Sequence, residues 1–352
     1  MTIEETVKLA RPNILTLKPY ACARDEFKGQ ADIFLDANEN SMGSVLSEAM
    51  NRYPDPLQVK LKEKIAEVKQ VNPNQIFLGN GSDEAIDLLY RVFCQPGQDS
   101  VIIQPPTYGM YGVSANINDV KILEAPLTPD FQPDVEKVIS LTGAYTKMIF
   151  FCSPNNPSAN IMDVENVKMI LTKFPGIVII DEAYIDFSEK KSWIEELNRY
   201  PNLVVMQTFS KAWGMAGLRL GMLFAHPQII SLMNKTKPPY NVNECTQKLA
   251  FAALSNKNHK DEMVKMLLSE RANLINGLSA LKPVKKVYPS DANFLLVKFN
   301  DAGKMYKDLM NRSIIVRNRS SMPGCDNCLR ITVGKPDENK RLIQTIKELD
   351  TK

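Results

Sequence analysis

The chain has 352 residues, of which 44% are hydrophobic and 24% charged, which is typical of about two globular domains and excludes a disordered or fibrous protein. Its 43 lysines and arginines nearly balance 40 aspartates and glutamates, and the basic residues are spread along the chain, so no nucleic-acid partner is expected. Neither a membrane span of roughly 18 apolar residues nor an apolar signal segment is visible, so we expect a cytoplasmic protein without membrane contact.

Short apolar runs alternate with helical patterns between about residues 75 and 225. Before this block, Pro56–Val71 is expected to be a helix, because its apolar residues recur at helical spacing. Within the block, Ser82–Cys94 is a second helix with an acidic first turn. The alternation predicts a mostly parallel sheet. Its expected strands are Gln75–Leu78, Val101–Gln104, Lys121–Glu124, Met148–Cys152, Val178–Asp181, Val204–Thr208 and Leu220–Phe224.

A second alternation follows a long helical stretch at about 241–281. It comprises Val284–Tyr288, Asn293–Phe299, a helix near Ala302–Asn311, Ser313–Val316, Leu329–Val333 and a closing helix from about residue 336. This pattern predicts a smaller α+β domain. We therefore expect an α/β protein with a large domain at 30–245, built on a seven-stranded sheet between helices, and a small domain formed by 1–29 and 246–352.

The cysteine and histidine content argues against a metal site. Cys325 and Cys328 have CxxC spacing, but a tetrahedral zinc site needs two further ligands, and His226 and His259 are the only histidines. We expect no metal and free thiols. Acid–base chemistry would then fall to Lys, Tyr, Asp or a cofactor.

A lysine stands directly after the strand expected at Val204–Thr208, in the segment Phe209-Ser210-Lys211. Ligands of α/β proteins bind at the carboxyl ends of the strands, and a lysine amine placed there could form a Schiff base with a carbonyl. For this segment alone, a surface lysine in a glycine-containing turn is the simpler interpretation.

Two other predicted strands also end in polar residues. The strand at Val178–Asp181 ends in a carboxylate, which is costly to bury unless it meets a cation or a hydrogen-bond donor. Met148–Cys152 is followed by Ser153-Pro154-Asn155-Asn156, which presents amide side chains. We expect both groups near Lys211.

A glycine turn joins a further strand to a helix at Gly79-Asn80-Gly81-Ser82-Asp83. Such a junction aims free backbone N–H groups at an anion, commonly a phosphate. The turn matches neither the dinucleotide-binding nor the P-loop pattern. The Ser82/Asp83 pair alone is also compatible with a plain helix cap.

Together these four segments resemble the fold-type I pyridoxal-phosphate aminotransferases. The resemblance implies that Lys211 is the Schiff-base lysine and that Asp181 pairs with the protonated pyridine nitrogen of the cofactor. It also implies that Asn155 and Tyr184 hydrogen-bond the phenolic oxygen of the ring. The resemblance implies that the cofactor phosphate is bound by the backbone of Ser82 and Asp83 and by the side chains of Ser210 and Arg219. It implies that Tyr108 stacks on the cofactor ring.

Further segments resemble the branch of this family whose amino donor is histidinol phosphate: Leu17–Tyr20, Leu35–Asn40, Arg52–Asp55, Ile315–Arg317 and Leu329–Gly334. This resemblance implies an amino-group transfer between L-histidinol phosphate and 2-oxoglutarate, giving imidazole acetol phosphate and glutamate in histidine biosynthesis. The residues implied to face the substrate are Tyr20, Asn38, Arg317 and Arg330. Tyr53 is implied to reach the cofactor phosphate of a second subunit, so that a homodimer shares its two sites.

Two positions depart from the family pattern, because Asp36 stands where Asn is usual and Ala159 where Gly is usual. Other chemistries on the same cofactor remain open, namely threonine-phosphate decarboxylation and aromatic amino transfer. A non-catalytic binding protein is a third possibility, although it would not need Lys211, Asp181 and Tyr184 together. Arg330 could also form a structural ion pair, and Tyr20 and Tyr53 could simply pack in their turns.

Overall fold

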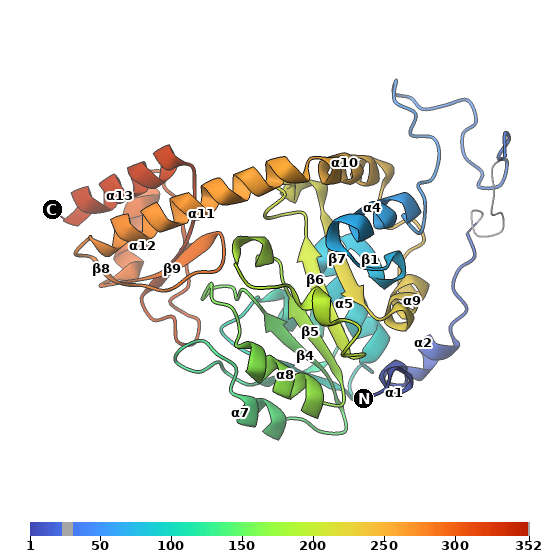
Figure 1. Cartoon of the computed structure of the whole chain (residues 1–352), viewed down its shortest axis with the longest axis horizontal. Coiled ribbons are helices and arrows are strands. Elements are labelled where there is room, and N and C mark those ends of the chain that lie inside the picture. Colours follow the sequence, from blue (N-terminus) through green and yellow to red (C-terminus); the bar gives the residue numbers. More distant parts are fainter. Residues whose placement is uncertain (23–30, 351–352) are drawn as a thin grey trace.

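A seven-stranded sheet forms the centre of the larger part of the molecule (Figure 1). The computed structural model describes residues 1–22 and 31–350. The strand order is β1-β7-β6-β5-β4-β2-β3, with β7 antiparallel to both neighbours and the other pairs parallel. The strands are β1 (Ile76–Asn80), β2 (Ser100–Ile103), β3 (Lys121–Glu124), β4 (Thr146–Cys152), β5 (Ile177–Asp181), β6 (Leu203–Thr208) and β7 (Leu220–Ala225).

Alternate residues of the central strands enter two separate cores, one on each face of the sheet. In β5, for example, Ile177 and Ile179 belong to one core and Val178 and Ile180 to the other, as the period of two in a strand requires. The first core is closed by α1 (Ile3–Val7), α2 (Pro12–Thr16), α5 (Gly81–Phe93), α6 (Met110–Ile117) and α9 (Pro227–Thr236). The second is closed by α4 (Val59–Lys69), α7 (Val135–Ser140), α8 (Val164–Lys173) and α10 (Glu244–Ser255).

A smaller antiparallel sheet of order β10-β11-β9-β8 forms the second part of the molecule. Its strands are β8 (Val284–Val287), β9 (Phe294–Phe299), β10 (Arg317–Asn318) and β11 (Cys328–Thr332), and its core also takes residues of α11 (Lys257–Ser279), α12 (Ala302–Asn311) and α13 (Pro336–Asp350). The long helix α11 runs from α10 on the large part to this small part (Figure 1). No helix within 1–22 and 31–350 is both long and apolar enough to cross a membrane.

The seven strands predicted for the large sheet are all present, with ends shifted by one or two residues. Three predictions need correction. The expected helix at 241–281 is two helices, α10 and α11, which meet at Asn256. The strand expected at Ser313–Val316 is absent, because Ser313 has φ +58° and the Ile314 N–H bonds the Leu309 carbonyl at the end of α12; the strand begins at Arg317 instead.

The third correction concerns the N-terminal residues, which the sequence analysis grouped with the small domain at 1–29. Helices α1 and α2 contact α9, and Ala10 and Ile14 are buried in a core of the large sheet. Apolar side chains of α9 form the surface that they cover. Residues 23–29 of that segment, and residue 30 at the start of the expected large domain, lie outside the described residues.

Two glycines let strand β7 pass directly against the first turn of α5. Gly81 begins this helix with φ +75°, a conformation that favours glycine. A Cβ atom on Gly221 would lie 2.4 Å from both the carbonyl carbon of Gly81 and the amide nitrogen of Ser82. The contact is backbone to backbone, so no side-chain rotation can relieve a larger residue here.

We expect Gly221→Ala to lower the free energy of unfolding by about 1–3 kcal/mol, because the added methyl group forces the β7 backbone away from α5. Gly217→Ala is the matched control, since a Cβ atom there has no neighbour within 4 Å. Urea denaturation of the two variants measures the difference. Equal stability of both variants would show that the packing at Gly221 is not tight.

Candidate active site

A cavity opens where β4, β5 and β6 end side by side. The last residues of these strands are Cys152, Asp181 and Thr208, and the register pairs Cys152 with Asp181. The cavity is lined by Ser82, Asp83, Tyr108, Cys152, Asn156, Asp181, Ala183, Tyr184, Thr208, Ser210, Lys211, Ala216 and Arg219. The structure therefore gathers most of the predicted cofactor residues at one sheet edge.

Asp181 lies at the buried end of this cavity, with only 4% of its surface exposed. Its two carboxylate oxygens accept hydrogen bonds from the Tyr111 hydroxyl at 2.8 Å and the Ala183 amide at 3.1 Å. Burial raises the pKa of Asp181 to about 6, and these two hydrogen bonds oppose the rise. No lysine or arginine of the described chain forms an ion pair with it, so the site offers a carboxylate to a cationic group such as a protonated ring nitrogen.

Lys211 extends from the loop after β6, with its amino nitrogen 5.4 Å from the centroid of the Tyr184 ring. Burial lowers the pKa of Lys211, the positive charges of Arg330 and Arg219 lower it further, and Asp181 opposes them. The amine is therefore more readily deprotonated than that of an ordinary lysine, as a nucleophile or base requires. The buried ring of Tyr184 is held edge-on against Phe294 of β9, with centroids 5.0 Å apart.

The opposite end of the cavity collects donors for an anion. The first N–H groups of α5, at Ser82 and Asp83, have no partners within the helix. Arg219 lies beside them, with its Nη2 3.6 Å from a carboxylate oxygen of Asp83. The hydroxyls of Ser210 and Thr208 are 3.0 Å apart. This donor set fits a phosphate group, and together with Asp181 and Lys211 it fits pyridoxal phosphate lying between the two ends.

Tyr108 also lines this end, and its hydroxyl donates to Asp83 at 3.1 Å. Tyr111 and Thr208 are functional candidates that the sequence analysis missed. From the sequence, Thr208 is expected only to end the strand Val204–Thr208. Nothing in the sequence tied Tyr111 to Asp181, which is 70 residues away.

The prediction for Asn155 needs correction. Its side chain is fully buried between its own loop and the loop after β2: its amide nitrogen donates to the Pro106 carbonyl and the Ser158 hydroxyl, and its oxygen accepts from Thr107. All of its polar atoms are therefore occupied. The next residue, Asn156, faces the cavity instead.

Arg330 connects this cavity to the small sheet. It lies in β11 directly opposite Arg317 of β10. Its guanidinium donates to the Asn156 oxygen at 2.6 Å and lies 5.3 Å from the centroid of the Phe294 ring. Within residues 1–22 and 31–350 it forms no ion pair, so the alternative of a structural ion pair lacks support there. Burial lowers the pKa of Arg330.

Tyr20, Asn38 and Tyr53 do not reach this cavity within one chain. Tyr20 is 76% exposed, on an N-terminal segment that projects from the large part on the side away from the small sheet (Figure 1). Tyr53 stacks on Tyr240 with ring centroids 4.4 Å apart. Asn38 and Tyr53 line a separate hollow next to Arg52.

Cys325 and Cys328 are both buried with free thiols. Burial raises the pKa of both thiols, which leaves them unreactive as nucleophiles. The described part of the chain has no group of three or more His, Cys, Asp or Glu side chains able to hold a metal ion.

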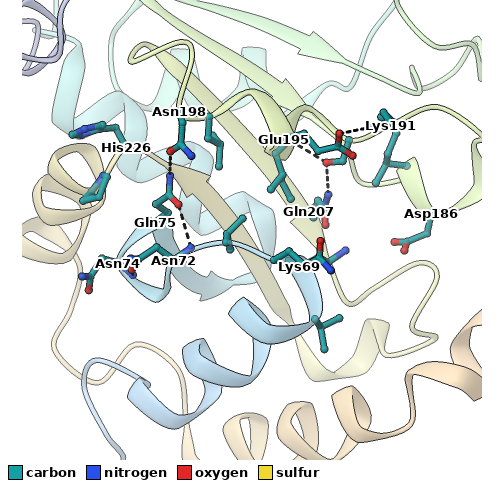
Figure 2. Close-up of a pocket in the computed structure, with 18 of the residues that line it drawn as sticks. Lys69, Asn72, Asn74, Gln75, Asp186, Lys191, Glu195, Asn198, Gln207 and His226 are labelled. Carbon is teal, nitrogen blue, oxygen red and sulfur yellow. Dashed lines mark hydrogen bonds and ion pairs between the residues drawn. The ribbon is translucent and has the colours of Figure 1, made fainter.

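A second, larger cavity of about 1120 Å³ lies elsewhere on the large part (Figure 2). Its wall includes Gln207, whose amide donates at 2.9 Å to the buried carboxylate of Glu182. Glu182 also accepts from the Ser192 hydroxyl and from the Trp193 amide. Burial raises the pKa of Glu182 to about 7, although these hydrogen bonds oppose the rise. Glu182 directly follows Asp181, so its hydrogen bonds also fix the position of the carboxyl end of β5.

Comparison with known proteins places this geometry in a family. The family described as aminotransferase class I and II matches residues 27–346, and the chain belongs to it. It is also 53% identical over 339 residues to the histidinol-phosphate aminotransferase of Cytophaga hutchinsonii, covering 96% of this chain and 97% of that protein.

Two solved structures share the fold. The histidinol-phosphate aminotransferase of Clostridium acetobutylicum superposes with a TM-score of 0.79 at 24% identity, covering 86% of this chain and 91% of the other. That of Sinorhizobium meliloti, solved in complex with pyridoxal-5'-phosphate, gives a TM-score of 0.78 at 21% identity and covers 86% and 83%. The prediction of a fold-type I architecture is thereby confirmed.

The raised pKa of Glu182 predicts a pH-dependent contribution to stability. Its native state holds a proton more tightly than the unfolded chain, whose value is near 4.5, so the contribution is present below pH 4.5 and is lost as the pH rises through about 7. In Glu182→Gln this loss, of up to about 3 kcal/mol, should disappear. Urea denaturation of both proteins between pH 5 and 8 measures it. Parallel curves for wild type and variant would contradict the assignment.

Proposed function

We propose that the chain transfers an amino group between L-histidinol phosphate and 2-oxoglutarate, giving imidazole acetol phosphate and glutamate in histidine biosynthesis. The observation that carries this conclusion is that Lys211 and Asp181 line one cavity and that Arg330 bonds Asn156 in its wall. It occurs in a chain 53% identical, over almost its whole length, to a protein named for this reaction.

Pyridoxal 5'-phosphate is the cofactor, and when bound it supplies an aldehyde that exchanges amino groups and a ring that takes up the electron pair left at the substrate Cα. Asp181 would hold a proton on the ring nitrogen, because a buried carboxylate is strongly stabilised by a cation beside it. Tyr184 and Asn156 would bind the ring oxygen, while Arg219, Ser210 and the first amides of α5 would bind the phosphate. Tyr108 would pack against the ring.

Lys211 is the group that moves protons. Its lowered pKa allows the amine to accept the proton from the substrate Cα and to donate it again inside the same cavity. The ring of Tyr184 lies beside this amine, while the lysine residue itself is exposed in the single chain. The same amine would therefore take up and return the proton from one position next to that ring.

Arg330 and Arg317 would bind the anionic ends of two unlike substrates. Histidinol phosphate has a phosphate and no carboxylate, whereas glutamate has two carboxylates. A guanidinium binds either anion through two parallel hydrogen bonds and keeps its charge throughout. One arginine pair can therefore serve both half-reactions.

Assay of the purified protein tests the reaction. With histidinol phosphate and 2-oxoglutarate it should form glutamate, while threonine phosphate should release no carbon dioxide and aromatic amino acids should react more slowly. Faster turnover of an aromatic donor, or decarboxylation of threonine phosphate, would assign the chain to another chemistry of the same fold.

Lys211→Ala should lose about 10³-fold or more in turnover, because the variant has no base at the substrate Cα. Borohydride treatment of wild type should attach a pyridoxyl group to Lys211, detectable by peptide mass spectrometry, and the variant should remain unlabelled. Lys340→Ala, which removes an exposed lysine of α13, is the control. Retained labelling and turnover in Lys211→Ala would remove this residue from the mechanism.

The protein also acts, in this proposal, as a cytoplasmic homodimer with shared sites. The N-terminal segment carries apolar side chains that one chain leaves almost fully exposed: Ile33, Leu35, Met42, Val45 and Leu46. Such a run favours burial against a second copy. Tyr20, Asn38 and Tyr53 lie on this segment, so a partner's segment would bring them to the cavity that they do not reach within their own chain. The cysteines at 94, 152, 245, 325 and 328 are free, which suits a reducing compartment.

Mixed dimers test the sharing of sites. Tyr53→Phe and Lys211→Ala should each be impaired alone, and a hybrid dimer of the two should regain activity. One of its two sites then combines an intact Lys211 with an intact Tyr53 from the other subunit. Size-exclusion chromatography verifies the dimer, and a hybrid no more active than its parents would contradict the sharing.

A further inference from the structure

We propose that Arg319, with the hydroxyl of Ser320, is an additional binding site for the phosphate group of the amino donor, next to Arg317 and Arg330. This inference rests on the proposed function, which supplies a phosphorylated donor. It adds a residue that the sequence analysis did not single out.

The small sheet brings three arginines together. Arg317 and Arg330 are directly opposite in the antiparallel pair β10·β11, and side chains of opposite residues lie on the same face. Backbone pairing between the two strands continues one residue beyond the end of β10, because the Arg319 amide donates to the Cys328 carbonyl at 2.9 Å. Arg319 is two residues after Arg317, so the alternation of a strand places its side chain on that same face.

Arg319 and Ser320 have polar atoms that nothing in the described chain satisfies. The Nε of Arg319 and the hydroxyl of Ser320 are both inaccessible to solvent and without a hydrogen-bond partner. The side chain of Arg319 forms no ion pair with any described residue either. An unpaired buried donor is costly in a folded protein. Two such donors on adjacent residues point to a ligand that carries several acceptor oxygens.

The charges of the three arginines agree with this. Arg330 and Arg317 both lower the pKa of Arg319, after the larger effect of its burial. The groups that oppose this lowering of the pKa of Arg319 are the Cys325 thiol and the Tyr184 hydroxyl, and neither is a carboxylate. No carboxylate in the described chain pairs with any of the three guanidiniums. Their mutual repulsion would be relieved by a ligand with two negative charges.

The position of the cluster connects it to the reaction. Arg330 donates to Asn156 and lies over the ring of Phe294, which contacts Tyr184; both Asn156 and Tyr184 line the Lys211 cavity. Arg330 in turn acts on Lys211. A phosphate held by the three arginines would thus lie at the small-sheet side of this cavity, where the far end of a bound amino donor would extend.

The number of donors favours a phosphate over a carboxylate. A carboxylate has two oxygens, which one guanidinium fork can satisfy, whereas a phosphate monoester has three terminal oxygens and up to two charges. The pair Arg330 and Arg317 can therefore serve glutamate without a third arginine. Arg319 should matter for the phosphorylated donor and little for glutamate.

The test compares Arg319→Gln with Arg341→Gln, which removes an exposed arginine of α13 on the same small part. In separate half-reactions of the holoenzyme, Arg319→Gln should lower kcat/KM for histidinol phosphate about ten- to a hundredfold. The values for glutamate and for dephosphorylated histidinol should stay within about twofold. The control should match wild type. An equal loss with histidinol and histidinol phosphate would overturn the inference.

Calorimetric titration of the holoenzyme with inorganic phosphate tests the site without turnover. Wild type should bind phosphate, Arg319→Gln should bind it at least about tenfold more weakly, and Ser320→Ala should show a smaller loss in the same direction. Absence of binding to wild type, or equal binding to wild type and Arg319→Gln, would overturn the inference. These outcomes do not depend on which donor the enzyme uses, so they are distinguishable from failure of the proposed reaction.

Discussion

The structure depends on one constraint, which is that a carboxylate must be kept at the buried end of a parallel strand. Asp181 satisfies it through two donors, Tyr111 on α6 and the amide of Ala183. Because β4, β5 and β6 run parallel, their carboxyl ends lie at one edge of the sheet, with Asp181 between Cys152 and Met206, and the loops that follow them meet there. Lys211, the amide of Asn156 and the aromatic ring of Tyr184 all reach the cavity on these loops. A shift of the β5 register by one residue would point the Asp181 side chain to the opposite face of the sheet and remove it from the site.

The site has two anion-binding ends built by different means. One end belongs to the large sheet and adds the side chains of Arg219 and Ser210 to the first amides of α5, which starts against β7 because Gly81 and Gly221 allow their main chains to touch. The other end belongs to the small sheet and uses side chains, namely the arginines of β10 and β11. A rigid backbone cradle suits a resident cofactor that stays bound. Guanidiniums on an edge strand suit ligands that exchange in each half-reaction.

The sequence predicted the large sheet well, because buried parallel strands are continuous apolar runs that end in polar residues. The same property located Asp181 and Lys211. It failed where a contact is set by tertiary packing alone, as for Tyr111, which is 70 residues from its partner. Asn155 and Asn156 are adjacent and chemically identical, so only the loop conformation decides which one faces the cavity. Arg319 was missed because its position next to Arg330 depends on the pairing of β11 with β10, and the sequence placed β10 at the wrong residues.

The ring of Phe294 contacts both Tyr184, which lines the Lys211 cavity, and Arg330 of the small sheet. Tyr184, beside the lysine, contacts it at 5.0 Å, and the guanidinium of Arg330 lies 5.3 Å from its centroid. A benzene ring cannot be compressed, and its neighbours are close-packed around it. One side chain of the small sheet therefore positions a cavity-lining residue of the large part and a guanidinium of its own sheet together. A smaller residue at 294 would loosen the ring of Tyr184 and the guanidinium of Arg330 at the same time.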